Sequence, residues 1–228
     1  MLKSLFLLSL LPAAVQAATI FSPGNTTFGI RSDGTNFIIA TQGGDGGNNV
    51  YTDNTFPANE SPDHIIDGVG QKYLNFAELN TGVMISPGNS SVVTSLQVWT
   101  ANDAVGRDPA TYSVYGTNQP LNGAGMPLSA FTLISTGAIA LPGVNEGEFR
   151  NAGGAAVLNA ANSATVNFAN TTAYANYAII FPTVKNEPAV NSMQVAEIQL
   201  NGTIVPEPGS ALLAGLGLGL LARRRRKA

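Results

Sequence analysis

The sequence predicts an all-β fold, in the form of a β-sandwich. Three observations lead to this prediction. Short runs rich in β-branched and aromatic residues recur along the chain, clusters of turn-forming residues separate them, and two of the longer runs alternate apolar with polar side chains. Asn, Gly, Ser and Thr are abundant while Lys and Glu are few, which disfavours helices. The spacing of the runs is typical of two packed sheets.

Seven segments carry this β pattern, and turn formers bound each of them. In chain order they are residues 36–40, 91–100, 110–115, 131–139, 164–168, 174–181 and 193–200. In the second segment Leu96 and Val98 alternate with Gln97 and Trp99, which predicts one buried face and one wet face. The last segment alternates in the same way, with one break at Ala196.

The first 17 residues have the parts of a secretory signal peptide. Lys3 precedes an apolar core from Leu5 to Leu11, and a short segment leads to a small residue at Ala17. We expect cleavage after Ala17. The apolar core is too short for a retained anchor, so residues 1–17 are left out of the fold prediction and the chain is expected to be exported.

Removal of both ends changes the charge of the protein. The body keeps five cations against thirteen acids, a net charge of −8, or −9 with Glu207, whereas the whole chain carries −3. Such a surface repels nucleic acid and anionic lipid, and it is compatible with neutral sugars and divalent cations. The absence of cysteine excludes disulfides and thiolate metal sites. Core burial, with a bound ion as a second source of stability, must hold the exported body together.

The C-terminal residues form three consecutive parts. The first is the tripeptide Pro206, Glu207 and Pro208, which its two prolines keep extended. Residues 209–222 follow as an uncharged run, shorter than the ~20 residues that a membrane-spanning helix normally needs. A basic cluster, favoured on the cytoplasmic side of a membrane, comes last. It consists of Arg223, Arg224, Arg225, Arg226 and Lys227.

This order of parts resembles the PEP-CTERM sorting domain of exopolysaccharide-producing Gram-negative bacteria. The resemblance covers residues 205–228. It implies a short hydrophobic helix that anchors the protein transiently in the inner membrane, with the arginines as the membrane stop. It also implies that a membrane protease, exosortase, cuts at or near Pro-Glu-Pro and releases the protein to the cell surface or the extracellular matrix. The alternative is an ordinary C-terminal anchor that is never cut.

Three stretches of the body, taken in order, resemble the galactose-binding-like jelly roll of discoidin, coagulation factor type C domains and many carbohydrate-binding modules. They are residues 64–76, residues 93–118, and residues 177–181 followed by 194–200. The resemblance spans about residues 59–202. It implies a jelly-roll β-sandwich that binds carbohydrate, with a polysaccharide or other matrix components as partners, and that does not catalyse a reaction.

The same resemblance implies one structural Ca²⁺ ion. In that family a carboxylate of the first stretch and a late glutamate before the last strand contribute ligands, and the matching positions here are Asp67 and Glu197. Calcium takes six to eight oxygens, so backbone carbonyls of residues 68–72 would complete the shell. Val69 stands where a second acid often follows the glycine. The alternatives are a turn residue for Asp67, and a solvated strand face or a salt bridge for Glu197.

Two polar pairs in the second stretch have two interpretations each. Arg107 and Asp108 either contact a sugar or pair to rigidify the turn before Pro109, and the structural role is favoured. Asn102 and Asp103 fit turn capping first and ligand contact second.

Three aromatic residues are candidate platforms for a sugar ring. Trp99, the only tryptophan, lies within a strand pattern, so we expect it to be half-buried on a strand face. Tyr51 and Phe56 lie among Gly, Asn and Asp residues and are expected on an exposed loop.

Few residues could support catalysis. His64 is the only histidine and no Gly-x-Ser-x-Gly sequence occurs, which argues against a Ser-His-Asp arrangement and excludes zinc held by two or three histidines. The carboxylate pairs Glu146 with Glu148 and Asp63 with Asp67 could flank a glycosidic bond. Acids so close in Gly-rich turns are usually solvated, so the protein is expected not to be an enzyme.

The chain is therefore expected to comprise a signal peptide (residues 1–17), a β-sandwich (18–204) and a sorting segment (205–228). The rival hypothesis is a structural or adhesive biofilm matrix protein with the same sandwich and no glycan site.

Overall fold

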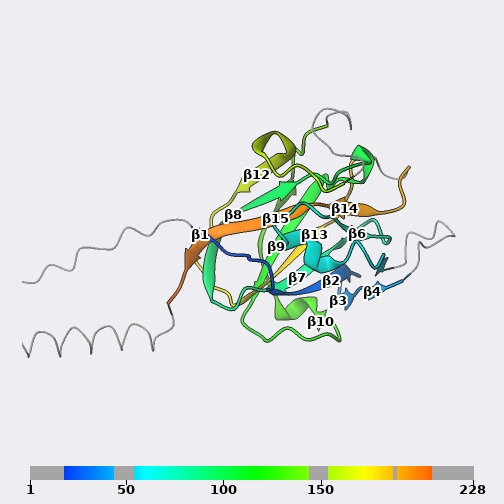
Figure 1. Cartoon of the computed structure of the whole chain (residues 1–228). Helices are drawn as coiled ribbons and strands as arrows, with labels where there is room; N and C mark the ends of the chain where they lie inside the picture. Colours follow the sequence, from blue (N-terminus) through cyan, green and yellow to red (C-terminus); the bar gives the residue numbers. More distant parts are fainter. Residues whose placement is uncertain (1–17, 44–53, 144–153, 187–188, 207–228) are drawn as a thin grey trace, which may run out of the picture.

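The structure is a computed structural model that describes residues 18–43, 54–143, 154–186 and 189–206. Within these ranges a four-stranded and a seven-stranded antiparallel sheet face each other (Figure 1). The predicted all-β class and sandwich architecture are confirmed. The predicted signal peptide and C-terminal hydrophobic helix lie outside the described residues. In the described part, helical structure is confined to single short 3₁₀ turns, none of them long and apolar enough to span a membrane. They are η1 (Pro62–Ile66), η2 (Val105–Arg107), η3 (Leu128–Ala130) and η4 (Ala160–Asn162).

The four-stranded sheet has the order β1-β15-β8-β12. Its strands are β1 (Ala18–Thr19), β15 (Glu197–Ile204), β8 (Ser91–Trp99) and β12 (Ser163–Asn167). The alternation predicted for β8 is confirmed, because Leu96 and Val98 are fully buried while Gln97 and Trp99 are half-buried. The last strand, β15, pairs with β8 along its whole length and with β1 on its other side, so it is an internal strand.

The seven-stranded sheet has the order β10-β3-β2-β7-β13-β9-β11. Its strands are β10 (Met126–Pro127), β3 (Asn36–Ile39), β2 (Thr26–Ser32), β7 (Thr81–Ser86), β13 (Asn176–Phe181), β9 (Thr111–Thr117) and β11 (Thr132–Ala138). Every residue of β13 is buried, as expected for a strand covered on both faces. The sequence pattern missed β2 and β7, which pair with each other, and β7 also pairs with β13.

The main core lies between the two sheets. It is built from inward-facing residues such as Val83 of β7, Leu96 of β8, Ile179 of β13 and Ile198 of β15. A second, smaller core lies on the outer face of the large sheet around Phe37 and includes Met84 and Ile180. The connection between β9 and β11 covers this face, since β10 and η3 belong to it. Both faces of the large sheet are therefore buried in part.

Two short sheets complete the fold, and the first of them joins the first and last stretches that suggested the jelly roll. β6 (Tyr73–Asn75) pairs antiparallel with β14 (Met193–Val195), and β4 (Thr41–Gln42) pairs parallel with β5 (Thr55–Phe56). β14 and β15 are separated at Ala196, whose N–H donates to the carbonyl of Trp99 at 3.2 Å. The predicted break at Ala196 is confirmed.

The antiparallel strands give the sandwich two distinct ends. One end, here called the tail end, holds β1, the start of β8 and the end of β15 at Ile204 (left in Figure 1). The other, here called the far end, holds Trp99, Glu197 and the β6–β14 pair (right in Figure 1).

Candidate functional site

Asp67 and Glu197 meet at one turn at the far end of the sandwich. The turn follows η1, and the Gly68 N–H donates to Glu197 Oε2 at 2.9 Å. Asp67 Oδ1 accepts from the N–H groups of Val69 at 2.8 Å and Gly70 at 3.2 Å. The two residues predicted as metal ligands therefore both accept hydrogen bonds from the backbone of residues 68–70, although 129 positions separate Gly68 from Glu197.

The surroundings of this carboxylate pair disfavour negative charge. Burial raises the pKa of Glu197 to about 8, the bond from Gly68 opposes the shift, and the nearby Asp67 carboxylate adds to it. Burial also raises the pKa of Asp67, against the hydrogen bond from Val69. Asp67 Oδ2 is buried and has no hydrogen-bond partner among the described residues. An orphaned carboxylate oxygen beside a second carboxylate is a destabilising arrangement that a bound cation would relieve.

The residues at this turn fit a calcium ion only with help from the backbone. In the described part of the chain, no group of three or more Asp, Glu, His or Cys side chains is placed to hold a metal. The two carboxylates would therefore supply a minority of the six to eight oxygens that Ca²⁺ takes. Carbonyl and water oxygens would supply the rest.

Lys72 ties the same turn to the neighbouring loops. Its Nζ lies 3.0 Å from both carboxylate oxygens of Asp103, 3.3 Å from Glu60 Oε1 and 3.4 Å from Gln194 Oε1. Gln194 is fully buried, and its Nε2 donates to the carbonyl of Asp103 at 2.6 Å. Asp103 therefore has a structural role that depends on Lys72, which the sequence pattern did not indicate. Asn102 Oδ1 is buried and makes none of the expected capping bonds within the described residues.

Asp108 belongs to a second ion pair that the sequence pattern missed. Its side chain is fully buried, and its Oδ2 lies 3.0 Å from Lys185 Nζ. Lys185 also donates to the carbonyl of Pro142 at 2.9 Å. The structural interpretation of Asp108 is supported, with Lys185 as a partner 77 residues away.

The candidate aromatic and catalytic residues have mixed outcomes. Trp99 is half-buried at the end of β8, as expected. The prediction for Phe56 is wrong, because Phe56 lies in β5 and packs edge-on against buried Tyr73, with ring centroids 6.4 Å apart. The free energy gained by burying the large apolar ring outweighs the preference of its polar sequence neighbours for an exposed loop. His64 lies in η1, with Nδ1 3.4 Å from the carbonyl of Lys72. The candidate aromatic residue Tyr51 and the candidate carboxylates Glu146 and Glu148 lie outside the described residues.

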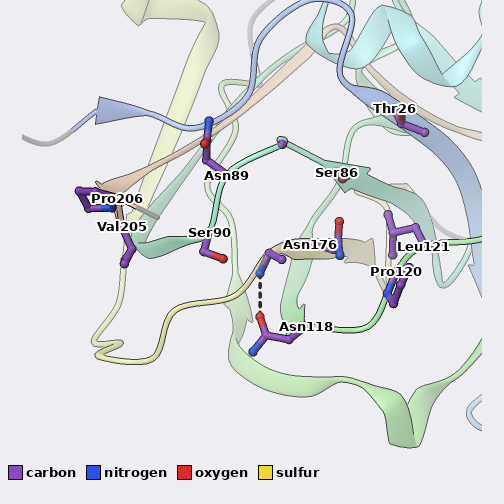
Figure 2. A pocket seen from close by; sticks show the side chains of 12 residues that line it. Thr26, Ser86, Asn89, Ser90, Asn118, Pro120, Leu121, Asn176, Val205 and Pro206 are labelled. Carbon is purple, nitrogen blue, oxygen red and sulfur yellow. Dashed lines mark hydrogen bonds between the residues drawn. The ribbon is translucent and has the colours of Figure 1, made fainter. Parts of the chain in front are cut away.

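A cavity of about 570 Å³ opens at the tail end (Figure 2). Five segments line it: the start of β2, the turn between β7 and β8, the loop after β9, the start of β13, and the residues after β15. Asn118 and Asn176 lie on two of these segments, and the side chain of each is directed toward the segment that carries the other. Val205 and Pro206 form part of the cavity wall. None of the twelve lining residues is charged. Sequence reasoning missed this cavity because its residues are dispersed over almost the whole body.

The sorting motif begins at the same end. Ile204, Val205 and Pro206 are exposed, and the Val205 N–H donates to the carbonyl of Ser90 at 2.8 Å. The described chain ends at Pro206, so the other predicted tail residues lie outside it. These are Glu207, Pro208 and the membrane-stop residues Arg223, Arg224, Arg225 and Arg226.

Residues 205–227 match the family model described as the PEP-CTERM protein-sorting motif. The chain ends in a PEP-CTERM sorting motif. The protein is therefore an exported protein with a C-terminal sorting tail, as the order of tripeptide, uncharged run and basic cluster predicted. No curated protein sequence matches this chain.

Several solved structures are similar to this protein. The family 32 carbohydrate-binding module of NanJ from Clostridium perfringens, solved in complex with galactose, is 12% identical, with a TM-score of 0.48 over 82% of this chain and 99% of that chain. A second family 32 module from Clostridium perfringens, solved with GalNAc-β-1,3-galactose, is 12% identical, with a TM-score of 0.45 over 80% and 99%. A chitosan-binding module from Paenibacillus sp. IK-5 is 13% identical, with a TM-score of 0.42 over 79% and 96%.

Proposed function

We propose that this protein is a surface or extracellular-matrix protein whose tail is cut by an exosortase at or near Pro-Glu-Pro, and whose body is a non-catalytic carbohydrate-binding β-sandwich. The tail anchors the protein transiently in the inner membrane before release, and the ligand is an exopolysaccharide. One observation carries the proposal. The last strand ends at Ile204, and the match to the sorting motif begins at the next residue.

The position of this junction supports processing of a folded protein. β15 is an internal strand, hydrogen-bonded to β1 and β8, so the four-stranded sheet is already complete before the tail begins. Val205 and Pro206 are exposed directly after it. A protease could therefore reach the Pro-Glu-Pro segment without unfolding the body, because cleavage needs an accessible, extended backbone.

Two features support carbohydrate as the ligand of the body. The stretches that resemble galactose-binding-like domains contain η1 and β6, β8 and β9, and β13 to β15, which are elements that build the core and the far end. The acidic body is also compatible with neutral sugars and repels polyanions. The proposal that the body is non-catalytic rests on the resemblance to these binding domains.

A calcium ion at the far end belongs to the same proposal. Asp67 and Glu197 would hold it together with backbone carbonyls, and the orphaned Asp67 Oδ2 supports this assignment. The ion would neutralise the buried Glu197 and the half-buried Asp67, and it would connect the turn after η1 to the start of β15. Its role would be structural, since calcium binding to the native state alone raises stability by mass action.

Processing is tested by expressing the full chain in cells with and without an exosortase. With the enzyme, the intact mass of the protein should show loss of the tail, and the protein should leave the membrane fraction. A triple variant with Pro206→Ala, Glu207→Ala and Pro208→Ala should stay uncut and membrane-bound, while Pro57→Ala, a single change outside the motif, should be processed normally. An uncut tail on the unmodified chain would favour the ordinary-anchor alternative. Self-association of the body without any glycan binding would favour the structural matrix hypothesis.

A further inference from the structure

We propose that the cavity at the tail end binds an uncharged sugar unit of a polysaccharide, and that Val205 and Pro206, which lead into the sorting motif, form part of this site. The proposal deepens the proposed function and rests on the carbohydrate-binding role of the body. It assigns that role to the end of the sandwich opposite the Asp67–Glu197 turn.

Two asparagines in the cavity are oriented by the backbone in complementary ways. Asn118 Oδ1 accepts from the Ala175 N–H at 2.9 Å, and Asn176 Nδ2 donates to the carbonyl of Gln119 at 2.9 Å (Figure 2 for the first bond). These bonds leave the Asn118 Nδ2 donors and the Asn176 Oδ1 acceptor without partners among the described residues. A sugar hydroxyl donates and accepts at once, so the hydroxyls of a sugar unit match both kinds of group.

The two amides are also held rigidly. Asn176 begins β13 and lies opposite Thr117 of β9, so its backbone is part of the large sheet. Asn118 follows directly after β9, and its bond to Ala175 fixes its side chain across the strand pair. Groups that are already ordered lose little conformational entropy when a ligand binds, which favours recognition of a polar ligand.

The size and chemistry of the cavity indicate a neutral ligand. Its volume of about 570 Å³ lies within the ~300–1,000 Å³ typical of small-molecule sites. Hydroxyl groups from residues such as Ser86 and Ser90 line it together with the amides, and Pro120 and Leu121 provide an apolar surface for the C–H groups of a sugar ring. The lining contains no cation to attract a uronate or sulfate group, and the body as a whole is acidic.

The start of the sorting segment is part of the same wall. The bond from the Val205 N–H to the Ser90 carbonyl continues the β15–β8 pairing past the last strand residue and holds Val205 beside the turn between β7 and β8. Processing therefore acts within a few residues of the sugar site.

The test is affinity electrophoresis of the purified full chain in detergent, through gels that contain dextran, galactan, mannan or the anionic polysaccharide alginate. Asn118→Asp keeps the acceptor for the Ala175 N–H and replaces the free donors, while Leu121→Trp places a bulkier side chain at the cavity wall. The matched control is Asn159→Asp, because Asn159 Oδ1 accepts from the Asn162 N–H at 3.0 Å near the far end and gains the same charge. We expect at least one neutral polysaccharide to retard the unmodified chain and the control equally. Both cavity variants should bind about tenfold more weakly, the loss expected for one to two hydrogen bonds.

The possible outcomes distinguish failure of the cavity site from failure of the carbohydrate-binding proposal. No retardation of the unmodified chain by any of the four polysaccharides would overturn carbohydrate binding and the cavity site with it. Retardation that both cavity variants retain would overturn the cavity site alone and leave the carbohydrate-binding body. Stronger retardation by alginate would overturn the neutral ligand class. Thermal unfolding of each variant identifies any that fails to fold, and the two cavity variants perturb the site by different means, so either one suffices.

Discussion

At Glu197, burial acts against the charge that the side chain would carry at neutral pH. Its pKa is raised from 4.5 to about 8, with burial as the main cause. In the unfolded chain the carboxyl loses its proton at lower pH than in the folded protein. Without a bound cation, the folded state therefore loses stability as the pH rises from about 4.5 to about 8, since the native state binds more protons over this range. A cation at the carboxylates reverses this preference, because it binds the deprotonated form.

We expect calcium to raise the thermal unfolding midpoint, and to raise it more at about pH 8 than at about pH 6, where protons compete for the carboxylates. The rise should vanish in Asp67→Asn and Glu197→Gln and persist in Asp63→Asn, which removes an exposed acid four residues from Asp67. In chelator, the decline in midpoint from acidic to alkaline pH should be smaller in Glu197→Gln than in the unmodified chain. Thermal scans by circular dichroism measure all of these quantities. Equal calcium responses in the four proteins would remove the assignment of the ion to this turn.

The sequence indicated some of the residues at the far-end site and missed the contacts of others. Asp67 and Glu197 were found because each lies in a stretch that resembles a known domain. Lys72 lies in the same stretch, but its contacts with Asp103 and Gln194 cross 31 and 122 residues. No local pattern encodes such pairs, because side-chain partners are set by the packing of loops. The cavity around Asn118 was missed for the same reason.

Among the strands, prediction succeeded where one face is polar or where an apolar run is long. β8 and β15 alternate, and β13 is a continuous apolar run, so all three were predicted within a few residues. β7 is buried on both faces yet contains Thr81, Gly82 and Ser86, which conceal its burial. β2 contains Gly29 at a point where Tyr73 and Pro62 approach the backbone closely. Such residues lower the apparent β propensity because the close contact needs a small side chain.

Gly82 is the clearest case of a strand position that requires glycine. It pairs with Ile180 of β13, and a Cβ atom there would overlap the carbonyl of Ile179. We expect Gly82→Ala to lower the free energy of unfolding by at least about 1–3 kcal/mol, the usual cost of forcing extra volume into a packed interior. Gly143→Ala is the matched control, because nothing lies within 4 Å of its Cβ position, and it should change stability by less than about 0.5 kcal/mol. Urea denaturation measures both. Similar stabilities for the two variants would mean that β7 and β13 can separate at this point at little cost.

The two candidate sites lie at opposite ends of the same sandwich. The carboxylate turn lies at the far end, where β15 begins, and the cavity lies at the tail end, where β15 finishes. β15 thus connects both sites and leads directly into the sorting segment. Its internal position means that the sorting tail can be removed without opening a sheet edge.

Three chains that start at Ala18 and end at different points test this arrangement. A chain that ends at Pro206 should have the unfolding midpoint and polysaccharide binding of the uncut protein, since every described strand is retained. A chain that ends at Ile204 should keep its stability within about 1 kcal/mol but bind polysaccharide more weakly, because it lacks the Val205 and Pro206 wall. A chain that ends at Ala196 should not fold, because it loses an internal strand together with buried Ile198 and Leu200. Circular dichroism and affinity electrophoresis distinguish the three. Unchanged binding by the chain that ends at Ile204 would show that Val205 and Pro206 contribute nothing to the site.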